Sequence, residues 1–102
     1  MAFVLYPVKN VTSTATTLRV ASATTTIIGL TLANTTVNEI TMDVFITRSA
    51  VDYYLVKGAP IPPNGTLVAV GGSQKVVLNA SDTLKAQSSA ATSADALLSV
   101  LE

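Results

Sequence analysis

The stretch that decides the fold is "NEITMDVFITRS", residues 38–49, in which apolar and polar side chains alternate. One side of an extended chain carries Ile40, Met42, Val44 and Ile46, and the other carries Thr41, Asp43, Phe45 and Thr47. Successive side chains of a strand point to opposite faces, so this period of two predicts a half-buried strand of an antiparallel sheet. Phe45 lies on the polar side, where it either fills a second interface or is covered by a neighbouring loop.

The same period of two recurs along the chain. In "TTTIIGLTLANTT", residues 24–36, Ile28, Leu30 and Leu32 are predicted to share one face, and Gly29 in mid-strand indicates a bulge or a close neighbour. Further short strands are expected within residues 16–22, 53–58, 66–70, 74–79 and 83–89. Together they predict a single all-β domain over residues 1–102: an antiparallel β-sandwich, immunoglobulin-like or jelly-roll-like, with about seven or eight strands.

Two stretches are predicted to interrupt the strands. The prolines of "APIPPNG", residues 59–65, have no backbone donor, so the preceding strand is expected to end there. Asn64-Gly65 is a strong turn signal. Gly71-Gly72 predicts a second turn, before residues 74–79.

Both ends of the chain are apolar. The segment "SADALLSVLE", residues 93–102, would suit a short helix with Ser93 as its N-cap. Because Ala96, Leu98 and Val100 alternate with Asp95, Leu97 and Ser99 in an otherwise all-sheet chain, we predict a strand that ties down this end. The opening "MAFVLYPV" either joins the home sheet or extends, over residues 1–10, as an arm that reaches a neighbouring molecule.

Composition excludes several kinds of site. The chain contains no cysteine and no histidine, so it has no disulfide, no thiolate or imidazole metal ligand and no Ser-His-Asp or Cys-His catalytic group. Its carboxylates are scattered and form no calcium-loop pattern. We therefore expect a protein that is not an enzyme and that uses no cofactor and no metal.

The charge balance points to association. Six basic residues face six acidic ones, so the basic excess that nucleic-acid binding requires is missing. Charged residues make up 12% of the chain and apolar residues 49%, which leaves little to oppose contact with other proteins. The longest apolar stretches fall far short of the ~20 residues that cross a membrane. These features predict a part of a protein assembly, with no nucleic-acid or membrane partner.

The aromatic residues supply the candidate contacts. Adjacent Tyr53 and Tyr54 must point to opposite faces of a strand, so they cannot form the flat platform that many sugar-binding modules use. We expect one of these rings in the core and the other exposed as an interface anchor. The candidate interface residues are Phe3, Tyr6, Phe45, Tyr53, Tyr54, Pro60, Ile61 and Pro62.

The second half of the chain resembles a group of small virion proteins of tailed bacteriophages. The resemblance covers most of residues 46–102 and is carried by turn and core positions. The matching residues are Tyr54, Val56, Lys57, Ile61, Pro62, Gly65, Leu67, Gly71, Gly72, Lys75, Val77, Leu78, Asp82, Leu84, Lys85, Ser88, Ser89, Ser93, Asp95, Ser99, Leu101 and Glu102. Ser81 departs from the pattern, which has glycine more often before the aspartate, and this puts the geometry of that turn in question.

The resemblance implies a structural part of a phage particle. The protein would be located in the virion and would dock in multiple copies, as a homo-oligomer in a ring or cluster. It would either decorate the capsid or form part of the collar at the head–tail neck, with the major capsid, portal or neck proteins as partners. The alternatives are a receptor- or glycan-binding module displayed on the particle, or an accessory protein of the tail or baseplate.

Overall fold

A computed structural model describes residues 2–71 and 75–102, and the chain in these ranges is built from strands and turns. The turn predicted at Gly71-Gly72 falls partly outside the described residues. The nine strands are β1 (Phe3–Val11), β2 (Thr16–Val20), β3 (Thr25–Asn34), β4 (Ile40–Arg48), β5 (Val51–Ile61), β6 (Thr66–Val70), β7 (Val76–Leu78), β8 (Thr83–Ser88) and β9 (Ala94–Leu101).

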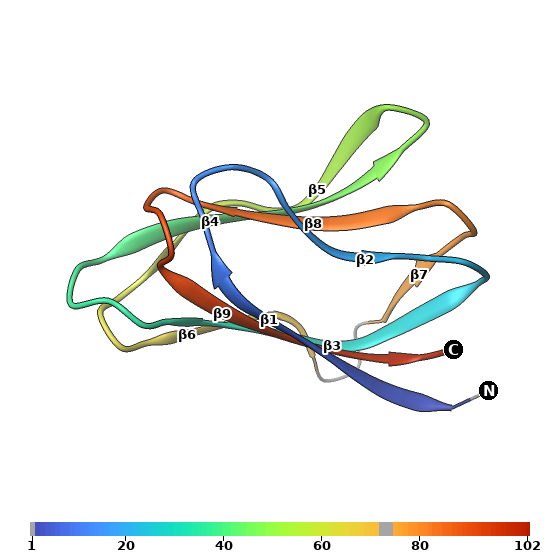
Figure 1. Ribbon diagram of the computed structural model, residues 1–102, viewed down its shortest axis with the longest axis horizontal. Helices are drawn as coiled ribbons and strands as arrows, with labels where there is room; N and C mark the ends of the chain where they lie inside the picture. The colour runs from blue at the N-terminus through green and yellow to red at the C-terminus, as the bar shows by residue number, and fades with distance from the viewer. Residues whose placement is uncertain (1, 72–74) are drawn as a thin grey trace.

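The strands form two antiparallel sheets that pack face to face, as Figure 1 shows. One sheet has the order β1-β9-β3-β6, with β7 also paired to β3, and the other has the order β2-β8-β4-β5. If the short β7 is left aside, the first strand pairs with the last, the second with the second-last, and so on inward to β4 and β5. This nested pairing is that of a jelly roll. The predicted antiparallel sandwich is therefore confirmed, and the strand order favours the jelly-roll alternative over the immunoglobulin-like one.

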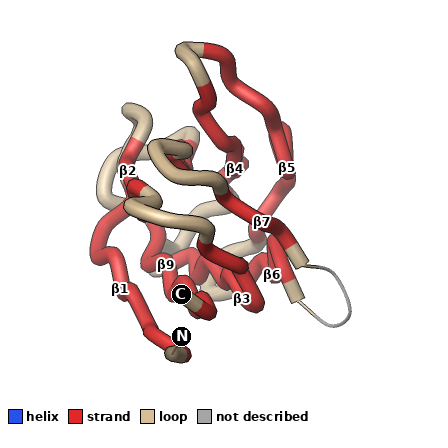
Figure 2. The backbone as a smooth tube through the Cα atoms, turned by 90° about the vertical axis from the view of Figure 1, so that its right-hand side faces the viewer, coloured by secondary structure: helices blue, strands red, loops and turns tan. Residues whose placement is uncertain are grey.

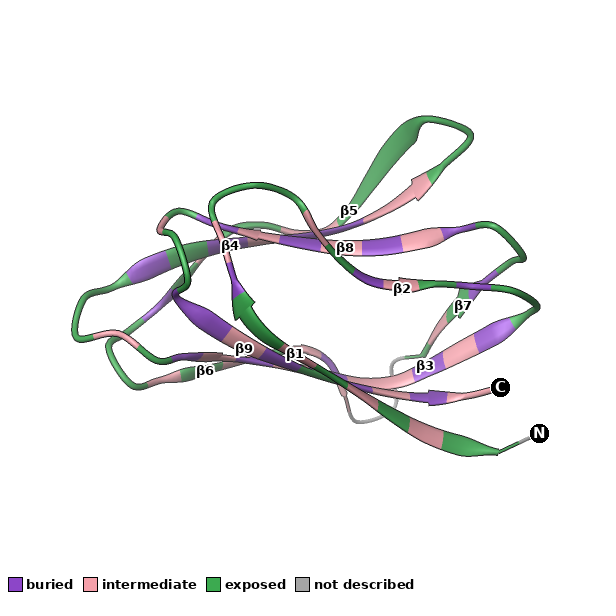
Figure 3. Cartoon of the chain, in the orientation of Figure 1, coloured by how far each residue is buried: buried purple, intermediate pink, exposed green. Residues whose placement is uncertain are grey.

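The core lies between the two sheets and receives every second side chain of the inner strands (Figure 3). The predicted core positions Ile40, Met42 and Val44 of β4 are almost fully buried. β9 lies between β1 and β3, and it buries Ala96, Leu98 and Val100. The prediction of a strand at this end of the chain is thus confirmed, because only an extended segment can hydrogen-bond to a neighbour on each side.

The prediction for β3 was wrong by one residue on one side of Gly29. Ile27, and not Ile28, is fully buried together with Leu30 and Leu32. The pairing of β3 with β9 shifts between Ile27 and Gly29, which is the bulge that glycine in mid-strand indicated. An extra residue in a strand reverses the side on which the following side chains fall, so the apolar alternation changes phase there.

The N-terminal segment lies in the home sheet. Phe3 to Val8 pair with β9, and β1 forms one edge of the five-stranded sheet. The inward side chains Val4, Tyr6 and Val8 pack against the core.

The prolines do not end β5 where the sequence suggested. The strand continues through Pro60 to Ile61, because β5 is the edge strand of its sheet and a missing donor on its open side breaks no pairing. Ile61 is fully buried. The predicted turn follows directly: the Gly65 backbone N–H donates to the Pro62 carbonyl at 2.9 Å, and Asn64 adopts a left-handed φ of 58°.

The β4–β5 hairpin extends beyond the body of the sandwich, as Figure 2 shows from the side. Its turn consists of Ser49 and Ala50, which both have positive φ, 52° and 62°. Such two-residue turns suit the twist of a hairpin but normally contain asparagine or glycine. The hairpin tip therefore carries a local backbone strain that the paired strands maintain.

Candidate docking surfaces

An aromatic stack covers the outer side of the β4–β5 hairpin. Phe45 and Tyr54 are cross-strand partners, and their ring centroids lie 5.1 Å apart. Lys57 Nζ lies 4.5 Å from the centroid of the Tyr54 ring and 3.7 Å from Asp43 Oδ2. Phe45 is consequently buried beneath the ring of the neighbouring strand, although it lies outside the core. What covers it is an adjacent strand and not a loop.

Tyr53 lies on the inner side of the same hairpin. It pairs with Ile46, and the two line an open pocket of about 160 Å³ together with Arg48. The opposite placement of Tyr53 and Tyr54 is confirmed, but the expectation that one ring enters the core was wrong. Tyr53 is 58% exposed and Tyr54 47% exposed, since the hairpin extends past the body of the sandwich.

An ion pair holds this hairpin next to its turn. Arg48 Nε donates to Asp82 Oδ1 at 2.8 Å, and a second guanidinium nitrogen pairs with Asp82 Oδ2. The carboxylate also accepts the Asn79 backbone N–H at 2.8 Å. The hydrogen bonds from Arg48 lower the pKa of Asp82 despite the opposing effect of burial. The turn before β8 thus holds a charged anchor for the last residue of β4.

A second exposed surface lies on the other side of the molecule, on the five-stranded sheet. The strand register places eleven of its outward side chains in three neighbouring rows: Phe3, Leu101, Thr26 and Val77; Leu5, Ser99 and Gly29; and Pro7, Leu97, Thr31 and Val68. We call these eleven residues the outer face. None of them is charged, and five large apolar ones are well exposed, from 48% for Leu97 to 76% for Phe3, whereas Leu101 is half-buried.

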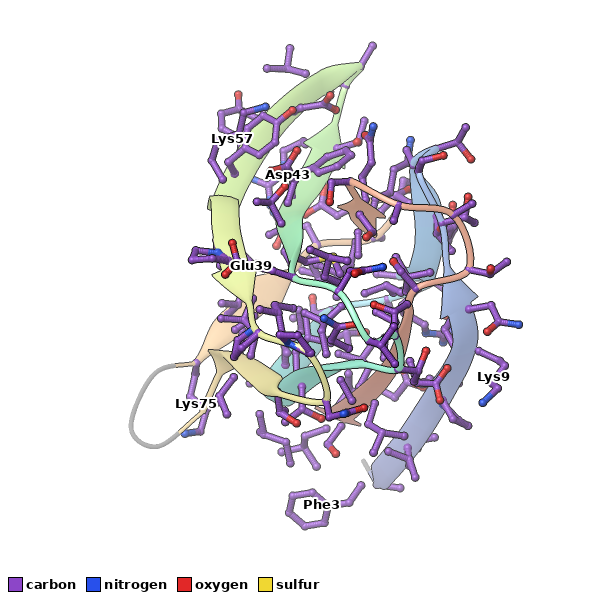
Figure 4. The ribbon with its side chains drawn as sticks, turned by 90° about the vertical axis from the view of Figure 1, so that its left-hand side faces the viewer. Phe3, Lys9, Glu39, Asp43, Lys57 and Lys75 are labelled. Atoms are coloured by element: carbon purple, nitrogen blue, oxygen red, sulfur yellow. The ribbon has the colours of Figure 1, made fainter. Side chains whose placement is uncertain are left out.

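Charges begin only at the margin of the outer face. Lys9 Nζ and Asp95 Oδ2 form an ion pair at 3.0 Å beside the third row. The hydrogen bond from Lys9 lowers the pKa of Asp95. The opposite side of the sandwich differs: its outward positions include Asp43, Asp52, Lys57 and Lys85. Figure 4 shows Phe3 and the pair Asp43 and Lys57 at opposite ends of the molecule.

A polar cluster bridges the two sheets near β1 and β2. The Tyr6 hydroxyl donates to Glu102 Oε1, and Arg19 contacts both oxygens of that carboxylate, at 3.1 and 3.2 Å. The Arg19 guanidinium lies 4.4 Å from the centroid of the Tyr6 ring. The hydrogen bond from Tyr6 is the main cause of the lowered pKa of Glu102, and the same bond raises the pKa of Tyr6. We interpret this cluster as a clamp between sheets.

The structure separates the eight candidate interface residues. Phe45, Tyr53 and Tyr54 come together in the hairpin, whereas Phe3 lies on the outer face and Tyr6 in the clamp. Pro60 and Pro62 are exposed beside the buried Ile61.

Sequence reasoning missed most of the outer face. Leu5, Leu97, Val68 and Val77 are exposed apolar residues, and a signal for them was present. In "FVLYPV" and "ADALLSVL" both phases of the alternation contain apolar residues, which indicates a strand with two apolar sides.

Two further kinds of site are not seen in the described chain. In residues 2–71 and 75–102, no three acidic, histidine or cysteine side chains gather in a way that could hold a metal ion. Within the same ranges, no helix could cross a membrane.

Comparison with known proteins gives a likeness of fold. No family model and no curated protein matches the chain. Among solved structures, it is similar to a pentameric capsid protein isolated from metagenomic phage sequences, with a TM-score of 0.53 and 16% sequence identity. The likeness covers 93% of this chain and 59% of that one, so the chain spans about three fifths of the neighbour's length. At this identity the likeness shows a common fold.

Proposed function

We propose that this protein is a non-enzymatic structural component of a tailed bacteriophage particle. It would dock in multiple copies on the capsid or at the head–tail neck. The observation that carries the proposal is the likeness of fold, over 93% of the chain, to a phage capsid protein that is itself an oligomer. The jelly roll is an architecture of viral capsid domains, and the sequence resemblance to small virion proteins points the same way.

The β4–β5 hairpin is the element we assign to docking on another virion protein. Tyrosine is enriched at the energetic centres of interfaces, since it buries a large ring while its hydroxyl still makes a hydrogen bond. Tyr53 and Tyr54 stand exposed on opposite sides of one hairpin. Because Arg48 and Phe45 hold the hairpin from both sides, little conformational entropy is lost on binding.

The glycan-binding alternative has less support. Jelly rolls also occur in lectins. The pocket beside Tyr53 is small at about 160 Å³, compared with roughly 300 Å³ or more for typical ligand sites. Tyr53 and Tyr54 lie on opposite sides of the hairpin and so cannot stack on one sugar face. A structural docking role therefore fits the exposed residues better.

Co-sedimentation with phage particles tests the proposal. Purified protein is mixed with particles of the phage that encodes it, prepared without the protein, and bound protein is measured after centrifugation. We expect saturable binding, and we expect Tyr53→Ala to weaken it by roughly tenfold or more. Val37→Ala, at an 81% exposed loop position, serves as the control. Failure of the wild-type protein to bind particles, or saturable binding to a glycan array in its place, would contradict the proposal.

A further inference from the structure

The open strand edges of the described chain are poorly suited to pairing with another molecule. β1 contains Pro7 and a register shift after Val8, and β5 contains Pro60 and two register shifts. β2, β6 and β7 are each no more than five residues long. Proline, bulges and short length are the usual means by which proteins prevent edge-to-edge association. Contacts between copies are therefore expected to use a face.

The outer face has a shape that could match its own copy. Along β3 its residues are small, namely Thr26, Gly29 and Thr31, whereas along the edge strand β1 they are bulky: Phe3, Leu5 and Pro7. β9 lies midway between these two strands. A two-fold axis running along β9 between two stacked sheets would place β1 of each copy over β3 of the other. The bulky side chains along β1 of one copy would then pack against the small side chains along β3 of its partner.

We propose that the outer face binds the outer face of a second copy of this chain, around a two-fold axis along β9. This inference rests on the proposed function, which it extends by naming the surface that joins the copies. The absence of charge on the outer face favours a second copy of this chain as the partner. None of the eleven residues is charged, so two such faces desolvate no ion, whereas a charged partner would have to lose its hydration without a counter-charge. Each Asp95 at the margin keeps its own Lys9.

The size of the face predicts a weak dimer. With the axis along β9, the positions of β1, β9 and β3 overlap, and three strand positions about 4.8 Å apart with three rows about 7 Å apart give a contact on the order of 300 Å² per copy. Stable complexes bury roughly 600–1,000 Å² per partner, so we expect a dissociation constant in the micromolar range. On a particle, attachment of each copy through its hairpin would raise the local concentration and strengthen this contact.

Sedimentation of charged variants tests the surface. The wild-type protein is expected to change from monomer to dimer between roughly 1 and 500 µM. Leu97→Glu places a charge beside the axis in both copies, and it should raise the dissociation constant on the order of 100-fold. Val20→Glu is the matched control, since Val20 is 51% exposed on the other sheet and Leu97 is 48% exposed. A wild-type monomer at all concentrations, or an unchanged dimer for Leu97→Glu, would overturn the proposal.

Cross-linking tests the symmetry without introducing a charge. Because the chain contains no cysteine, Leu97→Cys gives a unique thiol that should face its symmetry mate across the axis. Oxidation should yield a covalent dimer and nothing larger, whereas Val20→Cys should stay monomeric. Absence of a covalent dimer after oxidation of Leu97→Cys would contradict the proposed two-fold contact.

The two proposals fail separately. If Leu97→Glu is monomeric but still co-sediments with particles, both the docking role and the two-fold contact stand. If the wild-type protein dimerises but binds no particle, the outer-face contact stands and the proposed function is wrong.

Discussion

Arg48, the last residue of β4, is joined by two hydrogen bonds to Asp82, which lies in the turn before β8. Asp82 is buried although it carries a full charge, and its carboxylate also accepts the Asn79 backbone N–H. The pair connects the projecting hairpin to a rigid part of the sandwich. Together with the pairing of β4 to β8, which continues as far as Thr47 and Thr83, the ion pair fixes the end of the hairpin that carries the exposed tyrosines.

Replacing Arg48 should destabilise the fold. In Arg48→Met the buried carboxylate of Asp82 loses its cation, and an unpaired buried charge is more costly than the pair is favourable. We expect the melting temperature to fall by several degrees. Lys57→Met is the control, because Lys57 lies 3.7 Å from Asp43 in an exposed pair and such pairs contribute little. Equal melting temperatures for the two variants would show that Asp82 does not depend on Arg48.

Stability should fall in acid. The pKa values of Asp82, Asp95 and Glu102 are lowered by their hydrogen bonds, below ordinary values of 3.8, 3.8 and 4.5. The unfolded chain then binds protons first, so the stabilisation is complete above about pH 5 and is lost as the pH falls through the folded-state pKa values. Thermal melts from pH 7 to pH 2 measure this loss. Asp82→Asn should be less stable at pH 7, but its melting temperature should fall less steeply as the pH is lowered. An equally steep fall would show that Asp82 does not contribute to the loss of stability in acid.

Ser81 should be improved by glycine. Its φ of 76° lies in the left-handed region, which costs a residue with a β-carbon ~1–2 kcal/mol. Ser81→Gly removes that strain but adds freedom to the unfolded chain, so we expect a net gain of about 0.5–1 kcal/mol in urea unfolding. Ala80→Gly, in the same turn but without positive φ, should instead lose about 0.5 kcal/mol or more. Loss of stability in both variants would show that the turn is not strained at Ser81.

Gly65 should not tolerate a β-carbon. An added Cβ would lie 2.8 Å from Pro62 Cγ and 3.0 Å from the Pro62 carbonyl oxygen, so the turn after β5 would have to shift. Gly65→Ala is expected to cost about 1–3 kcal/mol in the free energy of unfolding. At Gly29 the nearest atoms would lie 3.9 and 4.0 Å away, so Gly29→Ala should be neutral or slightly stabilising. Equal free energies of unfolding for Gly65→Ala and Gly29→Ala would contradict this prediction.

Much of the fold could be predicted because apolar side chains alternate with polar ones along a strand, and the apolar ones face the core. Met42 and Val44 in β4 and Leu98 in β9 were placed correctly on this basis. Alternation fails where a bulge changes its phase, as at Ile27, or where an edge strand tolerates proline, as at Pro60. Gly29 marked the bulge, but the sequence does not say on which side of the glycine the phase changes, nor whether the strand that contains Pro60 lies at an edge.

The docking surfaces were harder to predict, because exposure depends on what the opposing sheet covers. Tyr53 lies on the inner side of its strand, yet it is exposed because the hairpin extends past the sandwich. The outer face combines residues from β1, β3, β6, β7 and β9, and their pairing depends on long-range topology. The Arg48–Asp82 pair likewise joins the end of β4 to the turn before β8, 34 residues further along the chain.

Image reconstruction of the intact phage particle tests the central claim most directly. We predict density for this jelly roll in many symmetry-related copies on the head or at the neck, with the tip of the β4–β5 hairpin against another virion protein. Particles that contain none of this protein, by reconstruction and by mass spectrometry of purified virions, would contradict the proposed structural role.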